Sequence, residues 1–289
     1  MAQRERIGII GLGRMGRPIA ARLSGGGFDV STWDTSVPAT ATSAAQLAAT
    51  VDVLVTILPG SPELRNVMLG MDGALAALRE GALWLDLTSA DPRVAREIAA
   101  TATARGVHSV GAPMGGGPEG AAAGELSFFV GGAATSIDRV RPVLALLGPT
   151  LTVMGDDIGA GYTTKLLANT LWFGQAVAVA EALLLGQAQG LEVGALAEAL
   201  KTSAAGSVFL SEHLPALLGG DYLESFGIDR VVEELETVTA LAAEEGTPAA
   251  LTNLVAKTHR DALKEFGAVD GELLAVKLLE LRAGRELRG

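Results

Sequence analysis

The first half of the chain alternates short apolar runs with alanine-rich stretches of helical spacing. The runs are rich in Val, Ile and Leu and are bounded by turn-forming residues, as expected of buried β-strands. Strands that alternate with helices in this way predict a parallel, doubly wound α/β sheet. The predicted strands are residues 7–10, 29–33, 51–58, 83–87, 107–110, 127–130 and 151–153.

The strand pattern stops near residue 158, and the remainder reads as helices separated by glycines. We therefore predict an α/β domain over residues 1–158 and an all-α domain over residues 159–289. Residues 166–185 are apolar enough to suggest a membrane span. Because Asn169, Gln175 and Glu181 lie inside that stretch, we prefer a long helix that joins the domains and is buried between domains or subunits.

A glycine motif follows the first predicted strand directly, and a helical pattern begins after it. In this context the first glycine permits a tight turn and the second lets a pyrophosphate approach the backbone. The third lets the helix pack close to the strand. The motif predicts a Rossmann-type dinucleotide site formed by Gly11, Leu12, Gly13, Arg14, Met15 and Gly16.

Asp34 ends the second predicted strand, 18 residues after Gly16. A carboxylate at this place accepts hydrogen bonds from ribose hydroxyls and repels a 2′-phosphate. Thr35, the next residue, offers no guanidinium to bind such a phosphate. NAD is therefore the predicted cofactor in preference to NADP. If Asp34 only begins the following turn, the selectivity stays open.

Two further strand ends face the same predicted crevice. Leu58 and Pro59 follow the third strand, and Thr88 and Ser89 follow the fourth. Their apolar and hydroxyl side chains suit the lining of a nicotinamide pocket. Turn formation explains the same residue types about equally well.

The overall composition narrows the range of functions. The chain has 289 residues, 49% of them hydrophobic, and a formal net charge of −11 from 22 Lys and Arg against 33 Asp and Glu. This balance disfavours nucleic-acid and anionic-membrane partners. With no cysteine and three scattered histidines, we expect no bound metal. The N-terminus lacks signal-peptide zones, which predicts a cytoplasmic protein.

Lys165 is the residue that most directly suggests a reaction. It follows Gly159 and Gly161 in the first turns of the long predicted helix, and Asn169 lies one turn further on the same face. The positive end of the helix dipole disfavours an ammonium there, which suits a group that gives up a proton. The alternative for a lysine near a helix start is a solvated surface residue.

In this order, the segments resemble the β-hydroxyacid dehydrogenase family, which includes 3-hydroxyisobutyrate dehydrogenases and semialdehyde reductases. The resemblance covers nearly the whole chain. It rests on residues 11–16, the Leu58-Pro59 pair, the Asp-x-Thr-Ser segment at 86–89, the glycine-rich loop at 111–117 and residues 159–169.

The resemblance implies an enzyme that transfers a hydride between NAD and C3 of a 3-hydroxy acid or semialdehyde. Lys165 would be the general acid/base, and Asn169 would orient a small, carboxylate-bearing substrate. The helical domain would take part in a homodimer or homotetramer.

The chain departs from the family's usual substrate loop at Gly111 and Gly115, where the family commonly has Asp and Ser. A hydroxyl donor to the substrate carboxylate is therefore missing. Backbone N–H groups of Gly115, Gly116 and Gly117 are the predicted replacement, and a flexible glycine turn is the alternative. A second departure is Glu233, which stands where the family commonly has a lysine that reaches toward the cofactor. Arg230, where the family usually has a leucine, is a candidate for the compensating charge, but we favour the alternative of an exposed surface arginine.

Trp172 comes seven residues after Lys165 and falls within about 20° of it around the helix. It is predicted either to line the substrate pocket or to pack in the helical core. Trp172 and the missing serine leave open an imine reductase, although Lys165 argues against one. A third hypothesis is a non-catalytic cofactor-binding module, which the joint presence of Lys165 and Asn169 opposes.

Overall fold

The computed structural model describes residues 5–224 and 226–289. The chain forms two compact units, one extending to Lys165 and the other running from Leu166 to Gly289. The first is the α/β unit and the second is helical, as predicted. The predicted domain boundary, residue 158, lies one residue before the long helix α8 (Gly159–Ala188) begins.

The α/β unit contains an eight-stranded sheet in the order β2-β1-β3-β4-β5-β7-β6, with β8 paired to β7. Strands β1 to β5 are parallel, whereas β7 runs antiparallel to β5 and β6. All seven predicted strands are present, and β6 is an additional short one. The bounds are β1 (Arg6–Ile10), β2 (Asp29–Trp33), β3 (Val53–Thr56), β4 (Leu83–Asp86), β5 (His108–Gly111), β6 (Met114–Gly115), β7 (Ser127–Gly132) and β8 (Thr150–Gly155).

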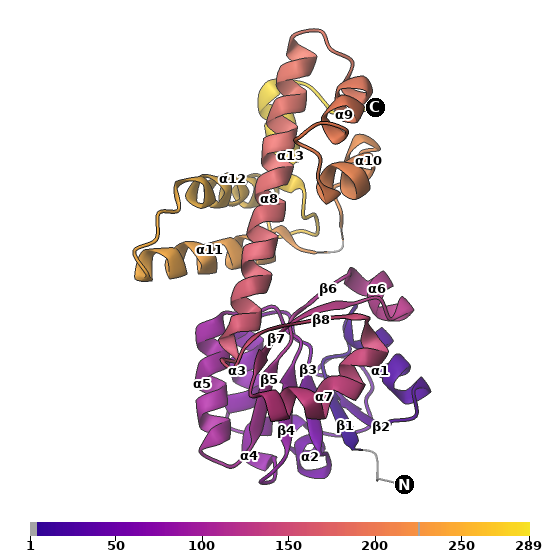
Figure 1. Cartoon of the computed structure of the whole chain (residues 1–289), viewed down its shortest axis with the longest axis vertical. Helices are drawn as coiled ribbons and strands as arrows, with labels where there is room; N and C mark the ends of the chain where they lie inside the picture. The colour runs from indigo at the N-terminus through magenta and orange to yellow at the C-terminus, as the bar shows by residue number, and fades with distance from the viewer. Residues whose placement is uncertain (1–4, 225) are drawn as a thin grey trace. The chain divides into compact units, whose positions relative to one another are not determined.

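Helices cover both faces of this sheet because the strands are apolar on both sides. Figure 1 shows α1 and α7 on one side of the sheet and α3 and α5 on the other. Ile9, Val55 and Leu85 belong to the first buried cluster, and their strand neighbours Leu54 and Trp84 belong to the second. The helices are α1 (Gly16–Gly25), α6 (Gly117–Ala123) and α7 (Ala134–Leu147) for the first cluster, and α2 (Ala44–Thr50), α3 (Ser61–Leu69), α4 (Ala74–Ala77) and α5 (Pro92–Thr103) for the second.

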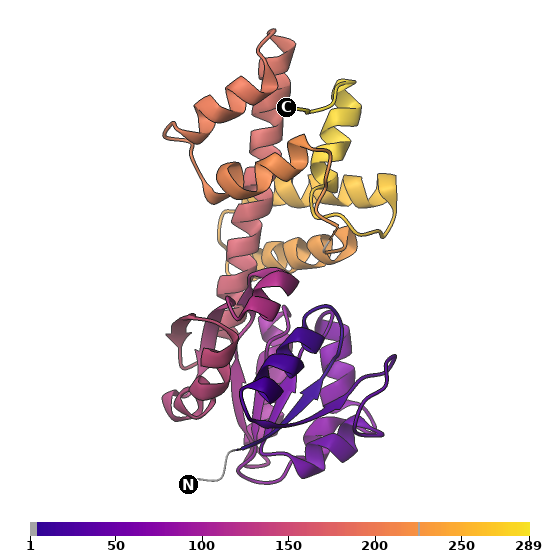
Figure 2. The same cartoon turned by 90° about the vertical axis from the view of Figure 1, so that its right-hand side faces the viewer.

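The helical unit packs around α8. One buried cluster joins α8 to α9, η1, α10 and α13, and another joins it to α11, α12 and α13. Figure 2 shows this set of helices, in which α11 and α12 pack against each other. The bounds are α9 (Val193–Lys201), η1 (Phe209–His213), α10 (Leu214–Leu218), α11 (Ile228–Glu244), α12 (Ala250–Phe266) and α13 (Leu274–Ala283).

The length and composition of α8 would allow it to cross a membrane, but those two properties are weak evidence alone. Phe173, Val177 and Leu183 of α8 are buried among the other helices of the second unit. A core helix of a folded unit has the same apolar character. We therefore interpret α8 as a core helix.

Candidate functional site

The predicted glycine motif forms a tight turn between β1 and α1. Gly11 has φ +99°, and a Cβ atom there would collide with the carbonyl oxygen of Ile57. A Cβ on Gly16 would collide with the carbonyl oxygen of Gly11, so the helix can approach the strand only with glycine at that place. By contrast, apart from the two chain neighbours of Gly13, no described residue has a heavy atom within 4 Å of the position of a Cβ on Gly13, which is exposed. The turn therefore has open space at the one glycine where a pyrophosphate is expected.

The amino end of α1 suits an anion. The N-cap residue is Met15, and its side chain makes no capping hydrogen bond to any residue that the structure describes. Uncapped N–H groups and the helix dipole together attract phosphate. Leu12 is buried and accepts a hydrogen bond at its carbonyl from Arg17 Nε at 2.9 Å, whereas Arg14 is exposed beside the turn. These residues fit a dinucleotide.

Asp34 lies beside the glycine turn, one residue beyond β2. Its carboxylate accepts hydrogen bonds from the backbone N–H groups of Leu12 at 2.7 Å, Ser36 at 2.7 Å and Val37 at 3.3 Å. Burial alone would raise the pKa of Asp34, but these N–H groups and the charge of Arg17 bring the pKa below its ordinary value. Asp34 is therefore a carboxylate anion at neutral pH, and it is only partly buried.

The ends of β3 and β4 are joined by a hydrogen bond. The hydroxyl of Thr88 accepts from the backbone N–H of Leu58 at 3.1 Å. Thr88 is completely buried, Leu58 and Ser89 are partly buried, and Pro59 is exposed. These four predicted residues thus lie on two adjacent parallel strand ends, next to the end of β1. Ligands of open α/β sheets bind in the crevice at this edge, where the strand order reverses.

Asp86, the last residue of β4, is a polar group whose role the sequence did not indicate. It is completely buried, and its carboxylate accepts hydrogen bonds from the hydroxyls of Thr56 at 2.5 Å, Thr88 at 2.7 Å and Tyr162 at 2.6 Å. Burial raises the pKa of Asp86 to about 6, and the hydrogen bonds from the three hydroxyls limit the increase. Burial and the adjacent Asp86 charge raise the pKa of Tyr162 well above its ordinary value, so Tyr162 remains the donor.

Lys165 lies in the second turn of α8, whose first turn is fixed to the α/β unit. Asp157 accepts a hydrogen bond from the backbone N–H of Gly159 at 3.1 Å and is itself held by Arg96 Nε at 2.9 Å. Lys165 is partly buried. Within residues 5–165, its ammonium has no hydrogen-bond or ion-pair partner.

Asn169 lies further along α8, in the helical unit. Its amide nitrogen donates to the carboxylate of Glu234 at 2.6 Å, and Glu234 is buried. This hydrogen bond fixes the amide group, and the sequence had not identified Glu234. The neighbouring Glu233 accepts from Arg230 at 2.9 Å, and Arg230 also lies 3.8 Å from the carboxylate of Asp229, so its charge offsets that of Glu233 only in part.

The predicted carboxylate-binding loop connects β6 to α6. Gly115 is the last residue of β6, and Gly116 and Gly117 follow with φ of +114° and +60°. Both values lie in the left-handed region that glycine adopts without strain. Gly116 and Gly117 are exposed, and within residues 5–224 and 226–289 no side-chain hydrogen bond caps the start of α6.

Trp172 packs within the helical unit. Its ring meets Phe173, Phe209 and His213 edge-on, with centroids 5.3 Å, 5.7 Å and 5.5 Å away. It contacts both buried clusters of that unit. Trp172 is partly buried in this packing, and its part in a substrate pocket stays a prediction.

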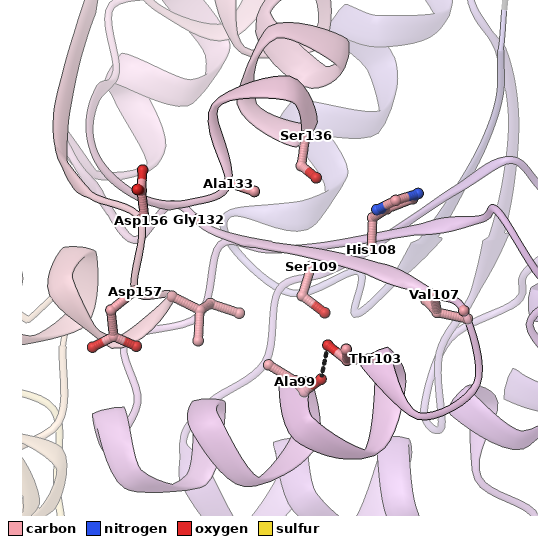
Figure 3. Close-up of a pocket in the computed structure, with 12 residues that line it drawn as sticks. Ala99, Thr103, Val107, His108, Ser109, Gly132, Ala133, Ser136, Asp156 and Asp157 are labelled. Atoms are coloured by element: carbon pink, nitrogen blue, oxygen red, sulfur yellow. Dashed lines mark hydrogen bonds between the residues drawn. The ribbon is translucent and has the colours of Figure 1, made fainter.

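A separate cavity of about 440 Å³ opens between α5, the start of β5 and the turn before α7. Ser109, Ser136 and Asp157 are among the side chains around it (Figure 3). None of the predicted site residues lines this cavity, so it is not the predicted cofactor or substrate site.

The sheet order, the glycine turn and the strand-end residues define a Rossmann-type dinucleotide-binding protein joined to an all-α unit. Comparison with known protein families supports this assignment for both units. Residues 6–155 match the NAD binding domain of 6-phosphogluconate dehydrogenase, and residues 159–279 match the domain described as NAD-binding of NADP-dependent 3-hydroxyisobutyrate dehydrogenase. The chain belongs to the β-hydroxyacid dehydrogenase family and is an NAD(P)-dependent dehydrogenase of that type.

Individual relatives cover nearly the full length. An NAD-dependent L-serine dehydrogenase of Pseudomonas aeruginosa is 32% identical over 97% of this chain and 100% of its own. A 3-hydroxyisobutyrate dehydrogenase of the same species is 33% identical over 91% of this chain and 95% of its own. The structure of Mycobacterium tuberculosis 3-hydroxyisobutyrate dehydrogenase with L-serine has a TM-score of 0.85 at 27% identity, covering 96% of this chain and 99% of that one. An imine reductase of Myxococcus stipitatus, at 18% identity and a TM-score of 0.65 over 96% of this chain and 100% of that one, shows a shared fold only.

Proposed function

We propose that the protein oxidises a small 3-hydroxy acid with NAD, or reduces the matching semialdehyde, with Lys165 as the general acid/base. The observation that supports this most is the position of Tyr162. Tyr162 reaches the end of β4 from the first turn of α8, at the sheet edge where the glycine turn and Asp34 lie. The helix that carries Lys165 thus begins at the cofactor edge of the sheet.

The proton chemistry follows from the residues of α8. When bound, the nicotinamide supplies or accepts the hydride. In the reductive direction Lys165 gives a proton to the oxygen of the former carbonyl, and in the oxidative direction it takes the hydroxyl proton. Asn169, with its amide fixed by Glu234, orients the substrate through its remaining amide hydrogen and carbonyl oxygen.

Asp34 supports a preference for NAD over NADP. Its carboxylate is charged at neutral pH and is partly accessible beside the glycine turn. Such a group accepts hydrogen bonds from the ribose hydroxyls and repels a 2′-phosphate. Leu58, Pro59, Thr88 and Ser89 complete the proposed cofactor contacts, with the hydroxyl of Thr88 acting through the hydrogen bonds that hold the two strand ends together.

The substrate is proposed to be a small 3-hydroxy acid, with L-serine and 3-hydroxyisobutyrate as the first candidates because relatives carry these names. Gly115, Gly116 and Gly117 would bind the carboxylate through backbone N–H groups. The exposed left-handed turn at Gly116 and Gly117 supports this role, since it leaves the backbone accessible.

Assembly and location are further parts of the proposal. Leu171 of α8 and Leu251 and Leu254 of α12 are exposed large apolar side chains. They support a homodimer or homotetramer formed through the helical unit, because burying them against another copy is favourable. The proposed setting is the cytoplasm.

Substitution of Lys165 tests the proposed reaction. NAD reduction is measured with a panel of 3-hydroxy acids, and NADH oxidation with semialdehydes and cyclic imines. We expect Lys165→Met to bind NADH normally but to lose roughly 10²- to 10⁴-fold in kcat, because its proton-transfer group is gone. The matched control is Lys201→Met, which removes a lysine at the end of α9 that pairs with Glu198.

Lys201→Met should keep wild-type turnover. Near-normal kcat in Lys165→Met would refute the role of Lys165, and turnover of imines alone would favour the imine reductase.

A further inference from the structure

Asp86 is a buried charge without a part in the proposed reaction. It occupies the end of β4, and none of its surface is exposed. Burying a carboxylate is costly unless hydrogen bonds replace its water. Three hydroxyls, on Thr56, Thr88 and Tyr162, supply those hydrogen bonds. The elements that carry these hydroxyls indicate what Asp86 does.

We call the hydrogen bonds of Asp86 with Thr56, Thr88 and Tyr162 the Asp86 network. Its first side, formed by Thr56 and Thr88, supports the proposed cofactor contacts. The Thr88 hydroxyl donates to Asp86 at 2.7 Å, which leaves its lone pairs to accept from the backbone N–H of Leu58 at 3.1 Å. Thr56, at the end of β3, donates to Asp86 and accepts from Trp84 Nε1 at 2.8 Å. The carboxylate therefore fixes the strand ends that precede Leu58 and Ser89.

The second side of the Asp86 network, formed by Tyr162, fixes the start of α8. Tyr162, which is completely buried, donates to the second carboxylate oxygen of Asp86 at 2.6 Å. Lys165 follows three residues later, and residues at this spacing are neighbours on a helix surface. A rotation of α8 about its axis that moved Lys165 would therefore break the hydrogen bond from Tyr162.

Glycines make room for this contact. A Cβ on Gly111 would collide with the ring of Tyr162, and one on Gly161 would collide with the carbonyl oxygen of Phe129. Gly111 is the position where the family commonly has Asp. The ring of Tyr162 and the carbonyl oxygen of Ile158 thus occupy the space that a side chain at position 111 would need.

We infer that Asp86 is a positioning residue that holds the strand ends beneath the cofactor and the helix turn that carries Lys165 in one fixed arrangement. This inference rests on the proposed function of Lys165. Its main consequence is that the effect on Lys165 and the effect on cofactor binding can be separated by mutation. The hydroxyl of Tyr162 serves only the helix side of the network, whereas the carboxylate of Asp86 serves both sides.

Tyr162→Phe is the principal test, because it removes one hydroxyl and keeps the ring. We expect kcat to fall roughly tenfold and the solvent deuterium isotope effect on kcat to rise, since a misplaced Lys165 slows proton transfer. The Kd for NADH, measured by fluorescence titration, should stay unchanged. Asp86→Asn should lower kcat and also raise the Kd for NADH several-fold.

The matched control is Tyr222→Phe, which removes a tyrosine hydroxyl that donates to the buried Glu280 in the helical unit. It should lower the Tm while leaving kcat, the isotope effect and NADH affinity unchanged. If Tyr162→Phe also lowers the Tm with no change in kcat or the isotope effect, the contact is structural only and the inference is wrong. Failure of the wild-type enzyme to turn over any tested substrate would instead refute the proposed function.

Discussion

Asp34 directly follows β2 and Asp86 ends β4, at the same edge of one sheet, yet their surroundings are opposite. Asp34 is partly exposed and accepts three backbone N–H groups, and its pKa is lowered. Asp86 is completely buried and accepts three side-chain hydroxyls, and its pKa is raised to about 6. The difference shows that residue type and strand position do not define a carboxylate's role. An accessible anion suits contact with a ligand, whereas a buried one suits the fixing of other groups.

The largest expected effect concerns the pH dependence of stability. Between about pH 4 and pH 6 folded Asp86 holds a proton that the unfolded chain, with its ordinary pKa of 3.8, has released. Stability should therefore fall as the pH rises through this interval, by about 3 kcal/mol from this group. Urea unfolding of the wild type and of Asp86→Asn at a series of pH values measures the difference. Parallel curves for the two proteins would show that Asp86 does not titrate in this way.

The second expected effect concerns cofactor choice. Asp34→Ala removes the charge that would repel a 2′-phosphate and the acceptor for the ribose hydroxyls. The ratio of kcat/KM for NADPH to that for NADH should rise roughly 10- to 100-fold, the usual range for a charged hydrogen bond. Asp29→Ala, at the exposed start of the same strand, is the control and should leave the ratio unchanged. A wild-type preference for NADPH would contradict the role of Asp34.

The smallest expected effect is the contribution of Asp34 to stability at acid pH. This contribution changes with pH in the opposite direction to that of Asp86. Because its folded pKa lies below the unfolded value of 3.8, Asp34 adds stability above that value and loses the contribution as the pH falls through the folded pKa. Asp34→Asn should thus be less stable than the wild type at neutral pH and lose this deficit in acid. Partial exposure keeps the effect small. Chemical unfolding at neutral and acid pH measures it, and a constant deficit at every pH would argue against the lowered pKa.

Features formed by residues close together in the sequence could be predicted from the sequence. The strand, glycine turn and helix at residues 6–25 follow one another directly, so their pattern was sufficient to predict the turn and the open space at Gly13. The alternation of strands and helices likewise predicted the doubly wound fold. An apolar run does not record strand direction, and therefore the antiparallel β7 was not anticipated.

Contacts between distant residues were harder to predict. The hydrogen bond from Tyr162 to Asp86 joins residues 76 positions apart, and Asn169 meets Glu234 across 65 positions. Trp172 illustrates the same limit, because helix periodicity gives its angle relative to Lys165 but not its packing partners. Those partners, Phe209 and His213, come from η1.

The space that Gly111 leaves for Tyr162 makes these two positions epistatic. Restoring the family's usual Asp at position 111 by itself would drive a side chain into a phenol ring in the buried interior, and overpacking of that kind is destabilising. A simultaneous change to a smaller residue at position 162 would remove the collision with the ring, but a Cβ at position 111 would still lie 2.9 Å from the carbonyl oxygen of Ile158. A mutational scan of single substitutions would therefore record Gly111 as intolerant, and part of that constraint belongs to the pair.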